Sequence, residues 1–154
     1  MKTELKKIKS SGDAKNLNMR KIDELVLDKT IVLVNKGQFK EASISLMPLI
    51  KKYPTSSLVC FVAAKFYYES GKYYSNSKYF IRLVLIKPDS EIASLGLFHS
   101  YIELGKISLV LKEITRFCRD NTPKLYKITI KELNDNVDNF NEVEQKLIHS
   151  LSDK

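Results

Sequence analysis

Residues 35–54 read NKGQFKEASISLMPLIKKYP, and two later stretches, 69–88 (ESGKYYSNSKYFIRLVLIKP) and 103–123 (ELGKISLVLKEITRFCRDNTP), follow the same plan. Each has a glycine, an apolar or aromatic residue two places later, an amphipathic run and a proline at its end. Gly37, Gly71 and Gly105 are spaced by 34 residues, and so are Pro54 and Pro88. A fixed period of this length indicates a repeat protein whose units are single supersecondary elements.

The residue types within each unit predict a pair of helices. Glycine tolerates the left-handed conformation that ends a helix, and proline suits the loop after a second helix because it has no N–H to donate. Between them, apolar residues such as Phe39, Ala42 and Leu46 recur at helical spacing. We expect first helices at about 22–36, 56–70 and 90–104, and second helices at about 40–52, 74–86 and 108–120.

Over about residues 22–122 these features resemble the tetratricopeptide repeat family. The resemblance implies an all-α, right-handed superhelix of about three helix-turn-helix repeats. KLYKITIKEL (124–133) and FNEVEQKLIHSL (140–151) are predicted to add a C-terminal capping helix pair, because the last repeat would otherwise leave an apolar face in water. We therefore divide the chain into a basic, flexible segment, 1–20, and a helical repeat domain, 21–154.

Two features depart from the regular repeat. Pro48 falls inside a predicted helix, where proline costs about 3 kcal/mol, so we expect a kink or an early helix end near Met47. The family places small residues where the two helices of a repeat cross. The first two crossings would pair Thr30 with Ala42 and Ala64 with Asn76, but the third would pair Phe98 with Val110, where we expect Gly96 to relieve the crowding.

Composition restricts the class of protein. Residues 1–21 contain seven basic and two acidic residues, which accounts for much of the net charge of +8, so the repeat region itself is only mildly basic. No apolar run is long enough for a signal peptide or a membrane span. Cys60 and Cys118 are too few for a zinc cluster or a disulfide framework. We expect a cytoplasmic protein.

Residues with catalytic potential do not form a recognisable motif. His99 and His149 lie far apart and lack spaced Cys or His partners, and there is no HExxH, GxxxxGK[ST], GxGxxG or GxSxG string. We expect a protein that is not an enzyme and uses no cofactor or metal.

In the tetratricopeptide family the first helices line a concave groove that receives a segment of a partner. Residue by residue, the resemblance implies that the groove residues are Leu27, Ile31, Phe61, Lys65, Tyr68, Leu95, His99 and Ile102. The same register adds Asp28, Val34, Asn35, Leu58, Val62, Glu69, Ile92 and Glu103. This groove would be apolar with few charges, and it lacks the set of basic side chains with which some family members grip a carboxylate.

The expected partner is another protein or a peptide, but three functions remain open. An apolar groove suits a chaperone or assembly factor resembling the small tetratricopeptide proteins that guard subunits of bacterial secretion systems. A basic surface would suit an immunity or inhibitor protein that neutralises a toxin. A basic N-terminus that contacts phosphate would suit a nucleic-acid-associated regulator, the less favoured interpretation. The cations and aromatics of residues 65–82, with Tyr68, Tyr74 and Tyr79 expected outside the core, could add a stacking surface.

Overall fold

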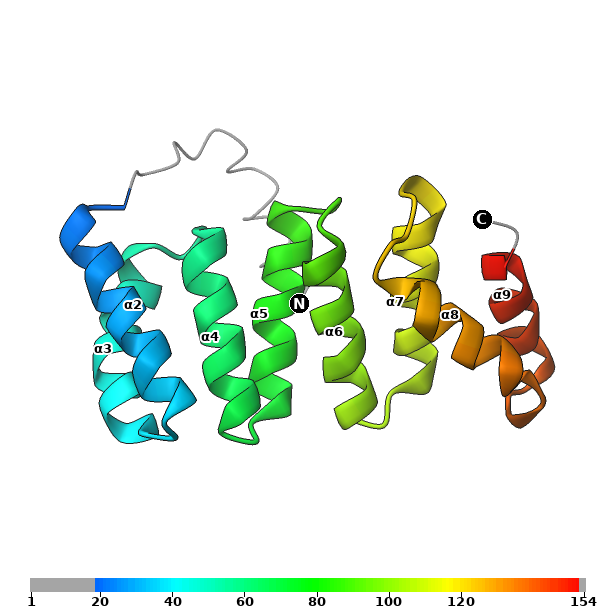
Figure 1. The fold of residues 1–154 in the computed structure, drawn as a ribbon, viewed down its shortest axis with the longest axis horizontal. Coiled ribbons are helices and arrows are strands. Elements are labelled where there is room, and N and C mark those ends of the chain that lie inside the picture. The colour runs from blue at the N-terminus through cyan, green and yellow to red at the C-terminus, as the bar shows by residue number, and fades with distance from the viewer. Residues whose placement is uncertain (1–18, 153–154) are drawn as a thin grey trace.

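The computed structural model describes residues 19–152 and is all-α within them, which confirms the predicted fold class (Figure 1). Helices hold 80% of these residues, and none lies in a strand. Residues 19–152 form eight α-helices and one short 3₁₀ helix, in the order α2 (Lys21–Asn35), α3 (Phe39–Lys52), α4 (Ser57–Glu69), α5 (Tyr73–Ile86), α6 (Glu91–Glu103), α7 (Ile107–Asp120), α8 (Tyr126–Asp135), η1 (Val137–Asn139) and α9 (Glu142–Ser152).

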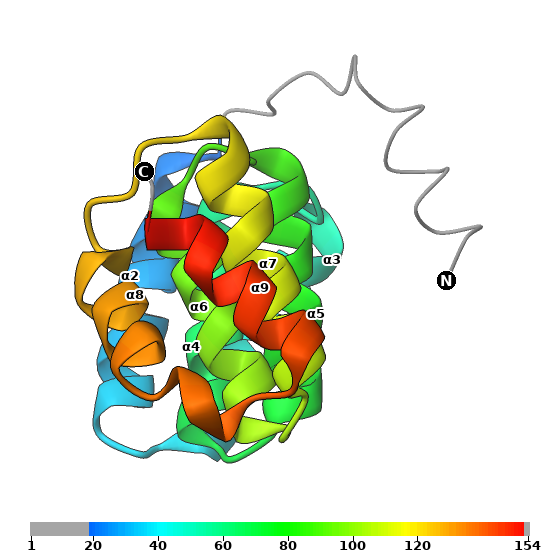
Figure 2. The same ribbon diagram turned by 90° about the vertical axis from the view of Figure 1, so that its right-hand side faces the viewer.

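The helices stand side by side in chain order along the long axis of the molecule (Figure 1). They form four successive pairs, because α2 packs against α3, α4 against α5, α6 against α7 and α8 against α9. The pairs are joined through contacts of α4 with α2 and α3, of α6 with α5, and of α9 with α7. Seen from the C-terminal side, α2, α4 and α6 lie on one side of the array and α3, α5 and α7 on the other (Figure 2).

Each of the first three pairs turns at a glycine in the left-handed region. Gly37, Gly71 and Gly105 have φ values of +71°, +71° and +64°. At the second turn, the Gly71 amide donates to the Tyr68 carbonyl at 2.9 Å and the Lys72 amide to the Tyr67 carbonyl at 2.8 Å. The same two bonds close the other turns, so all three are Schellman motifs, and the predicted glycine turns are confirmed.

The starts of α4 and α6 also follow the period. Ser56 and Ser90 are their N-cap residues, and each side-chain oxygen accepts the amide three residues later, at 3.4 and 3.3 Å. These bonds satisfy amides that have no partner within the helix. Pro54 and Pro88 lie in the loops just before these caps.

Of the two outcomes expected near Met47, a kink or an early helix end, the early end is wrong, because α3 continues past Pro48 to Lys52. Pro48 has no N–H for the carbonyl of Ile44, one turn earlier. Both residues are exposed, Ile44 by 76%. Water can therefore reach the carbonyl that the proline leaves without a donor.

A buried polar link joins the three central helices. Asn76 of α5 is fully buried, and its Nδ2 donates to the carbonyl of Ala64 in α4 at 2.8 Å. Its Oδ1 accepts a hydrogen bond from Ser100 of α6. The predicted crossing of Ala64 and Asn76 is thereby confirmed.

Gly96 makes room at a different junction from the one expected. A Cβ built on Gly96 would lie 2.1 Å from Cε1 of Phe80, a residue of α5. The missing side chain therefore admits the Phe80 ring between α5 and α6, and it does not relieve the crossing of Phe98 and Val110.

The C-terminal pair docks through a buried network. Glu113 of α7 accepts from Ser94 of α6 at 2.6 Å and from Arg116 at 2.7 and 2.9 Å. The hydroxyl of Tyr126, the first residue of α8, lies 3.0 Å from Ser94 Oγ, and its ring packs on Phe98. Burial raises the pKa of Tyr126, so its phenol remains neutral and able to donate.

Carboxylates at one repeat position, in the first and third pairs, accept hydrogen bonds at a helix end. Glu91 Oε1 accepts the amides of residues 124, 125 and 126 at 2.7–2.9 Å, which caps the start of α8 from another helix. Asp23 lies 68 residues earlier and accepts from Lys52 at 2.7 Å and from Tyr53 at 2.6 Å, just where α3 ends. The corresponding residue of the second pair is Ser57.

Met19 and Arg20, which the prediction placed in the flexible segment 1–20, contact the helical domain. Met19 packs against the first core cluster, and Arg20 Nε donates to Asp23 at 3.0 Å. The predicted flexibility of residues 1–18 lies outside the described residues. Within residues 19–152, every helix is too short or too polar to cross a membrane.

Candidate functional site

Apolar side chains at matching repeat positions lie exposed on α4 and α6. Along each helix, residues spaced by three, four and three positions share one side, and every position on α4 has its counterpart 34 residues later on α6. We call this set the apolar face: Leu58, Phe61, Lys65 and Tyr68 with Ile92, Leu95, His99 and Ile102. Its five most accessible large apolar side chains are each 40–60% exposed: Leu58, Phe61, Tyr68, Ile92 and Ile102.

A hollow of about 450 Å³ opens at the loop end of this face. Its lining combines α4, α5, α6 and the loop between α5 and α6, through Ser57, Leu58, Phe61, Leu83, Lys87, Ser90, Ile92 and Ala93. Lys87 contributes its only charged side chain. A hollow of this size and lining suits a large apolar side chain beside a negative charge.

The structure separates the predicted groove residues into two groups. Leu27 is completely buried and belongs to the first core cluster, as do Val34 and Val62, so their predicted place in the groove is wrong. Ile31 is partly buried against the same cluster. The other six of the principal set, Phe61, Lys65, Tyr68, Leu95, His99 and Ile102, lie at equivalent positions on α4 and α6.

Leu27 is buried because the two junctions between first helices differ. Leu27, Phe61 and Leu95 occupy the same repeat position. α2 packs directly on α4, and Leu27 is buried in the core cluster that α2, α3 and α4 share. α4 and α6 make only minor contact, and the hollow lies between them, so Phe61 remains exposed on its wall.

Charge is distributed unevenly along the apolar face. Lys87 lies at the loop end, Lys65 and His99 lie in the middle, and Glu69 and Glu103 follow Tyr68 and Ile102 at the glycine-turn end. Burial, followed by the nearby carboxylate of Glu103, raises the pKa of Tyr68. Tyr68 is therefore a neutral phenol at physiological pH, and the turn end is negative while the loop end is positive.

The aromatic residues of 65–82 do not form one stacking surface. Tyr79, expected outside the core, is partly buried and stacks on Tyr67 with ring centroids 5.4 Å apart, so that prediction is wrong. Tyr74 is exposed on α5, where Lys78 lies 4.5 Å and Lys106 5.9 Å from its ring centre. Tyr68 lies on α4 against Tyr73. The exposed aromatics thus belong to different helices.

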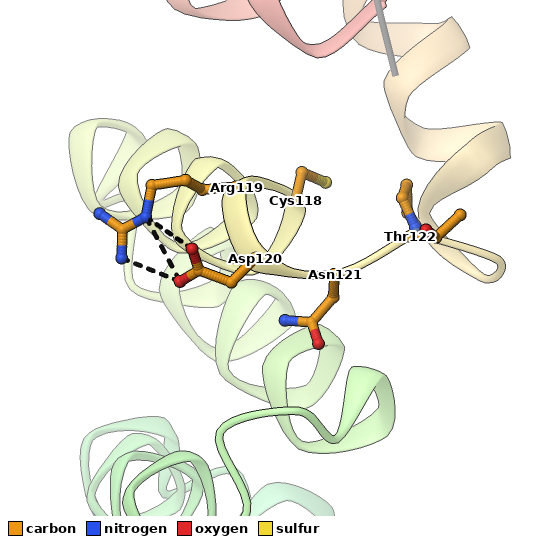
Figure 3. Close-up of a pocket in the computed structure, with 6 residues that line it drawn as sticks. Cys118, Arg119, Asp120, Asn121 and Thr122 are labelled. Carbon is orange, nitrogen blue, oxygen red and sulfur yellow. Dashed lines mark hydrogen bonds and ion pairs between the residues drawn. The ribbon is translucent and has the colours of Figure 1, made fainter.

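A second hollow, of about 360 Å³, lies at the end of α7 (Figure 3). It is lined only by the consecutive residues 118–123. Arg119 binds Asp120 at 3.0–3.3 Å, and Asn121 donates to the Phe117 carbonyl at 3.1 Å. Because these polar groups are paired within the segment, we do not assign a ligand to it.

We searched the described residues for metal-binding clusters and reactive thiols. No three His, Cys, Asp or Glu side chains among them gather as they would to hold a metal ion. Cys60 and Cys118 are buried, and burial raises the pKa of Cys60, which keeps its thiol protonated.

Comparison with protein-family models, with curated proteins and with solved structures returns no match for this chain.

Proposed function

We propose that this protein is a non-enzymatic binding module that holds an apolar segment of another protein along α4 and α6. One observation carries the proposal: large apolar side chains stay exposed at matching positions on both helices and flank a hollow. Leu58, Phe61 and Ile92 belong to none of the buried core clusters, so packing within the described residues leaves much of their apolar surface uncovered. Exposed apolar surface of this kind is typical of a binding site.

The face favours an amphipathic segment with a preferred direction. A large apolar residue of the segment would fill the hollow, and smaller ones would pack along Tyr68 and Ile102. A carboxylate of the segment next to that large apolar residue would pair with Lys87. A basic residue of the segment about three helical turns away would pair with Glu69 and Glu103. Such complementary charges select the direction of binding more than they add affinity.

The same features support a role as a chaperone or assembly factor. A segment with a continuous apolar side aggregates when uncovered, and a small helical array can cover it until it is assembled. The 34-residue period of turns and caps supports a tetratricopeptide-like superhelix. Because the chain resembles small tetratricopeptide proteins that guard subunits of secretion systems, we propose that its client is a subunit of a larger assembly, with a bacterial secretion system as the leading candidate.

The test is site-specific photo-crosslinking in the native host. A photoreactive phenylalanine analogue at Phe61 should capture one client and map to an apolar segment of it. The same analogue at Ile44, an exposed apolar residue on α3, is the matched control. Equal capture at both positions would contradict the proposal.

Affinity for the purified client then tests the mechanism. Truncating an anchor residue commonly costs about 2 kcal/mol, so Phe61→Ala and Tyr68→Ala should each weaken binding about 30-fold, and Ile44→Ala should not. Affinity should change little between about 50 and 200 mM salt, because apolar contacts release no counterions. An affinity that collapses with salt and ignores Phe61→Ala would instead favour binding through basic surface.

A further inference from the structure

The outward side of α2 carries a second apolar stripe, separate from the apolar face. Ile22, Leu25 and Val32 are each more than half exposed, and Lys29 lies between the last two. Their spacing of three, four and three residues places them on one side of the helix. We call these four residues the α2 stripe.

The repeat shows that this side of a first helix is built for packing. Leu25 is 54% exposed, whereas Val59, its counterpart in α4, is 1% exposed. Val32 is 51% exposed, whereas its counterpart Phe66 is 4% exposed. α4 buries these positions against the preceding pair. α2 has no preceding pair among residues 19–152, so its apolar residues lie open.

Exposed charges lie within and beside the α2 stripe. Glu24, Asp28 and Lys29 are all exposed. Within the described part of the chain none of the three forms an ion pair. Both signs are therefore present next to one apolar seam, as a self-complementary surface requires.

We propose that the α2 stripe binds the same stripe of a second copy, with the two helices antiparallel about a two-fold axis. Ile22 then faces Val32 of the second copy, and Leu25 faces Lys29 of the second copy. The Lys29 stem covers Leu25, and its ammonium group reaches Asp28 of the second copy. Each contact occurs twice, so the assembly closes at two chains.

The charges favour this occupant and this direction. A parallel pairing would place Lys29 against Lys29 of the second copy, which is repulsive. Residues 1–18 are a poorer occupant, because they contain five lysines, which Lys29 repels from within the stripe, whereas a second copy brings its own Asp28 to pair with Lys29. The dimer leaves the apolar face on α4 and α6 open in both copies.

Sedimentation velocity of the full chain over a dilution series is the first test. We expect a species of twice 17.7 kDa that dissociates on dilution. Leu25→Lys should raise the dissociation constant at least about tenfold, because it places an unpaired charge in the apolar seam. Ile44→Lys, on α3 outside the stripe, should leave it unchanged.

A wild-type chain that stays monomeric at every concentration would overturn the proposal. If Leu25→Lys also lowered the unfolding midpoint of that monomer, the stripe would belong to a segment of the same chain.

Disulfide trapping tests the direction. Leu25→Cys and Lys29→Cys proteins, mixed and oxidised, should form mainly the mixed dimer, because these positions face each other in the antiparallel pair. Cys60 and Cys118 are buried and should not interfere. Preferential pairing of Leu25→Cys with itself would overturn the antiparallel arrangement.

Discussion

The junction of α2 with α4 and that of α4 with α6 are built from the same repeat position, yet one is closed and the other open. At the first, Leu27 is buried between the helices. At the second, its counterpart Phe61 lies on the wall of a hollow. In the first pair, Asp23 of α2 accepts hydrogen bonds from Lys52 and Tyr53 at the end of α3. The second pair has Ser57 at the equivalent position, where it lines the hollow.

Residues at equivalent repeat positions therefore differ in their role, because one packs in the core and the other stays exposed. The repeat register alone does not distinguish the two. A position that builds the core in one unit is free to contact a partner in the next, depending on how closely its helix approaches its neighbour. Stability and binding should therefore respond to different members of one set of equivalent residues.

The largest expected effect is on stability at the closed junction. Leu27→Ala removes a fully buried side chain and should lower the free energy of unfolding by about 2–5 kcal/mol. Phe61→Ala, its matched counterpart, should lower it far less because Phe61 lies outside the core clusters. Urea denaturation measures both, and equal losses would remove the distinction between the junctions.

Overpacking should disturb the position of α6. Gly96→Ala places a methyl group against the Phe80 ring and should cost about 1–3 kcal/mol in urea denaturation. Combining it with Phe80→Leu, which frees the space, should recover part of the loss. A Gly96→Ala protein as stable as wild type would show that the ring moves aside without cost.

The hydrogen bonds of Asp23 predict that the stability of the protein depends on pH. Hydrogen bonds from Arg20, Lys52 and Tyr53 lower the pKa of Asp23 well below its usual range. Its contribution to stability is complete above the unfolded pKa of about 3.9 and is lost as pH falls towards the lower folded value. Between pH 5 and pH 3, the urea midpoint of wild type should therefore fall more than that of Asp23→Asn. Parallel curves would exclude this contribution of Asp23.

The smallest expected effect concerns the open junction. Ser57→Asp would supply the missing carboxylate beside Lys87, and an exposed ion pair of this kind contributes about 0.2–1 kcal/mol. The variant should be slightly more stable in low salt and no more stable in high salt. Ser57→Asn, with similar shape and no charge, is the control; if it matches Ser57→Asp, charge is not responsible.

The fold was predictable because its signals are local. A glycine that must adopt positive φ marks a turn without reference to the rest of the molecule, and three of them at one period set the pairs. The Asn141–Glu144 capping box that starts α9 is equally visible in the sequence. The early helix end expected at Pro48 was wrong, because the effect of a proline inside a helix depends on whether water can reach the carbonyl that it leaves without a donor.

The candidate site was predictable only in part, because exposure depends on neighbouring helices. Register located Phe61 and Ile102 but could not show that α2 approaches α4 closely enough to bury Leu27. The prediction missed three residues that complete the hollow. Leu83 lies on α5, Lys87 lies in the loop after α5, and Ala93 is a buried residue of α6. Glu91 was also missed, because its three acceptor bonds reach a segment more than 30 residues away.

The link from Glu91 to the start of α8 also limits how such an array can lengthen. An extra 34-residue unit inserted between α5 and α6 would leave Glu91 and residues 124–126 at their present separation. The same unit inserted between α7 and α8 would part them, and α8 would start without its cap unless the new unit brought its own carboxylate. Gene duplication or protein engineering should therefore extend this molecule from within, upstream of α6, and keep its last two pairs together.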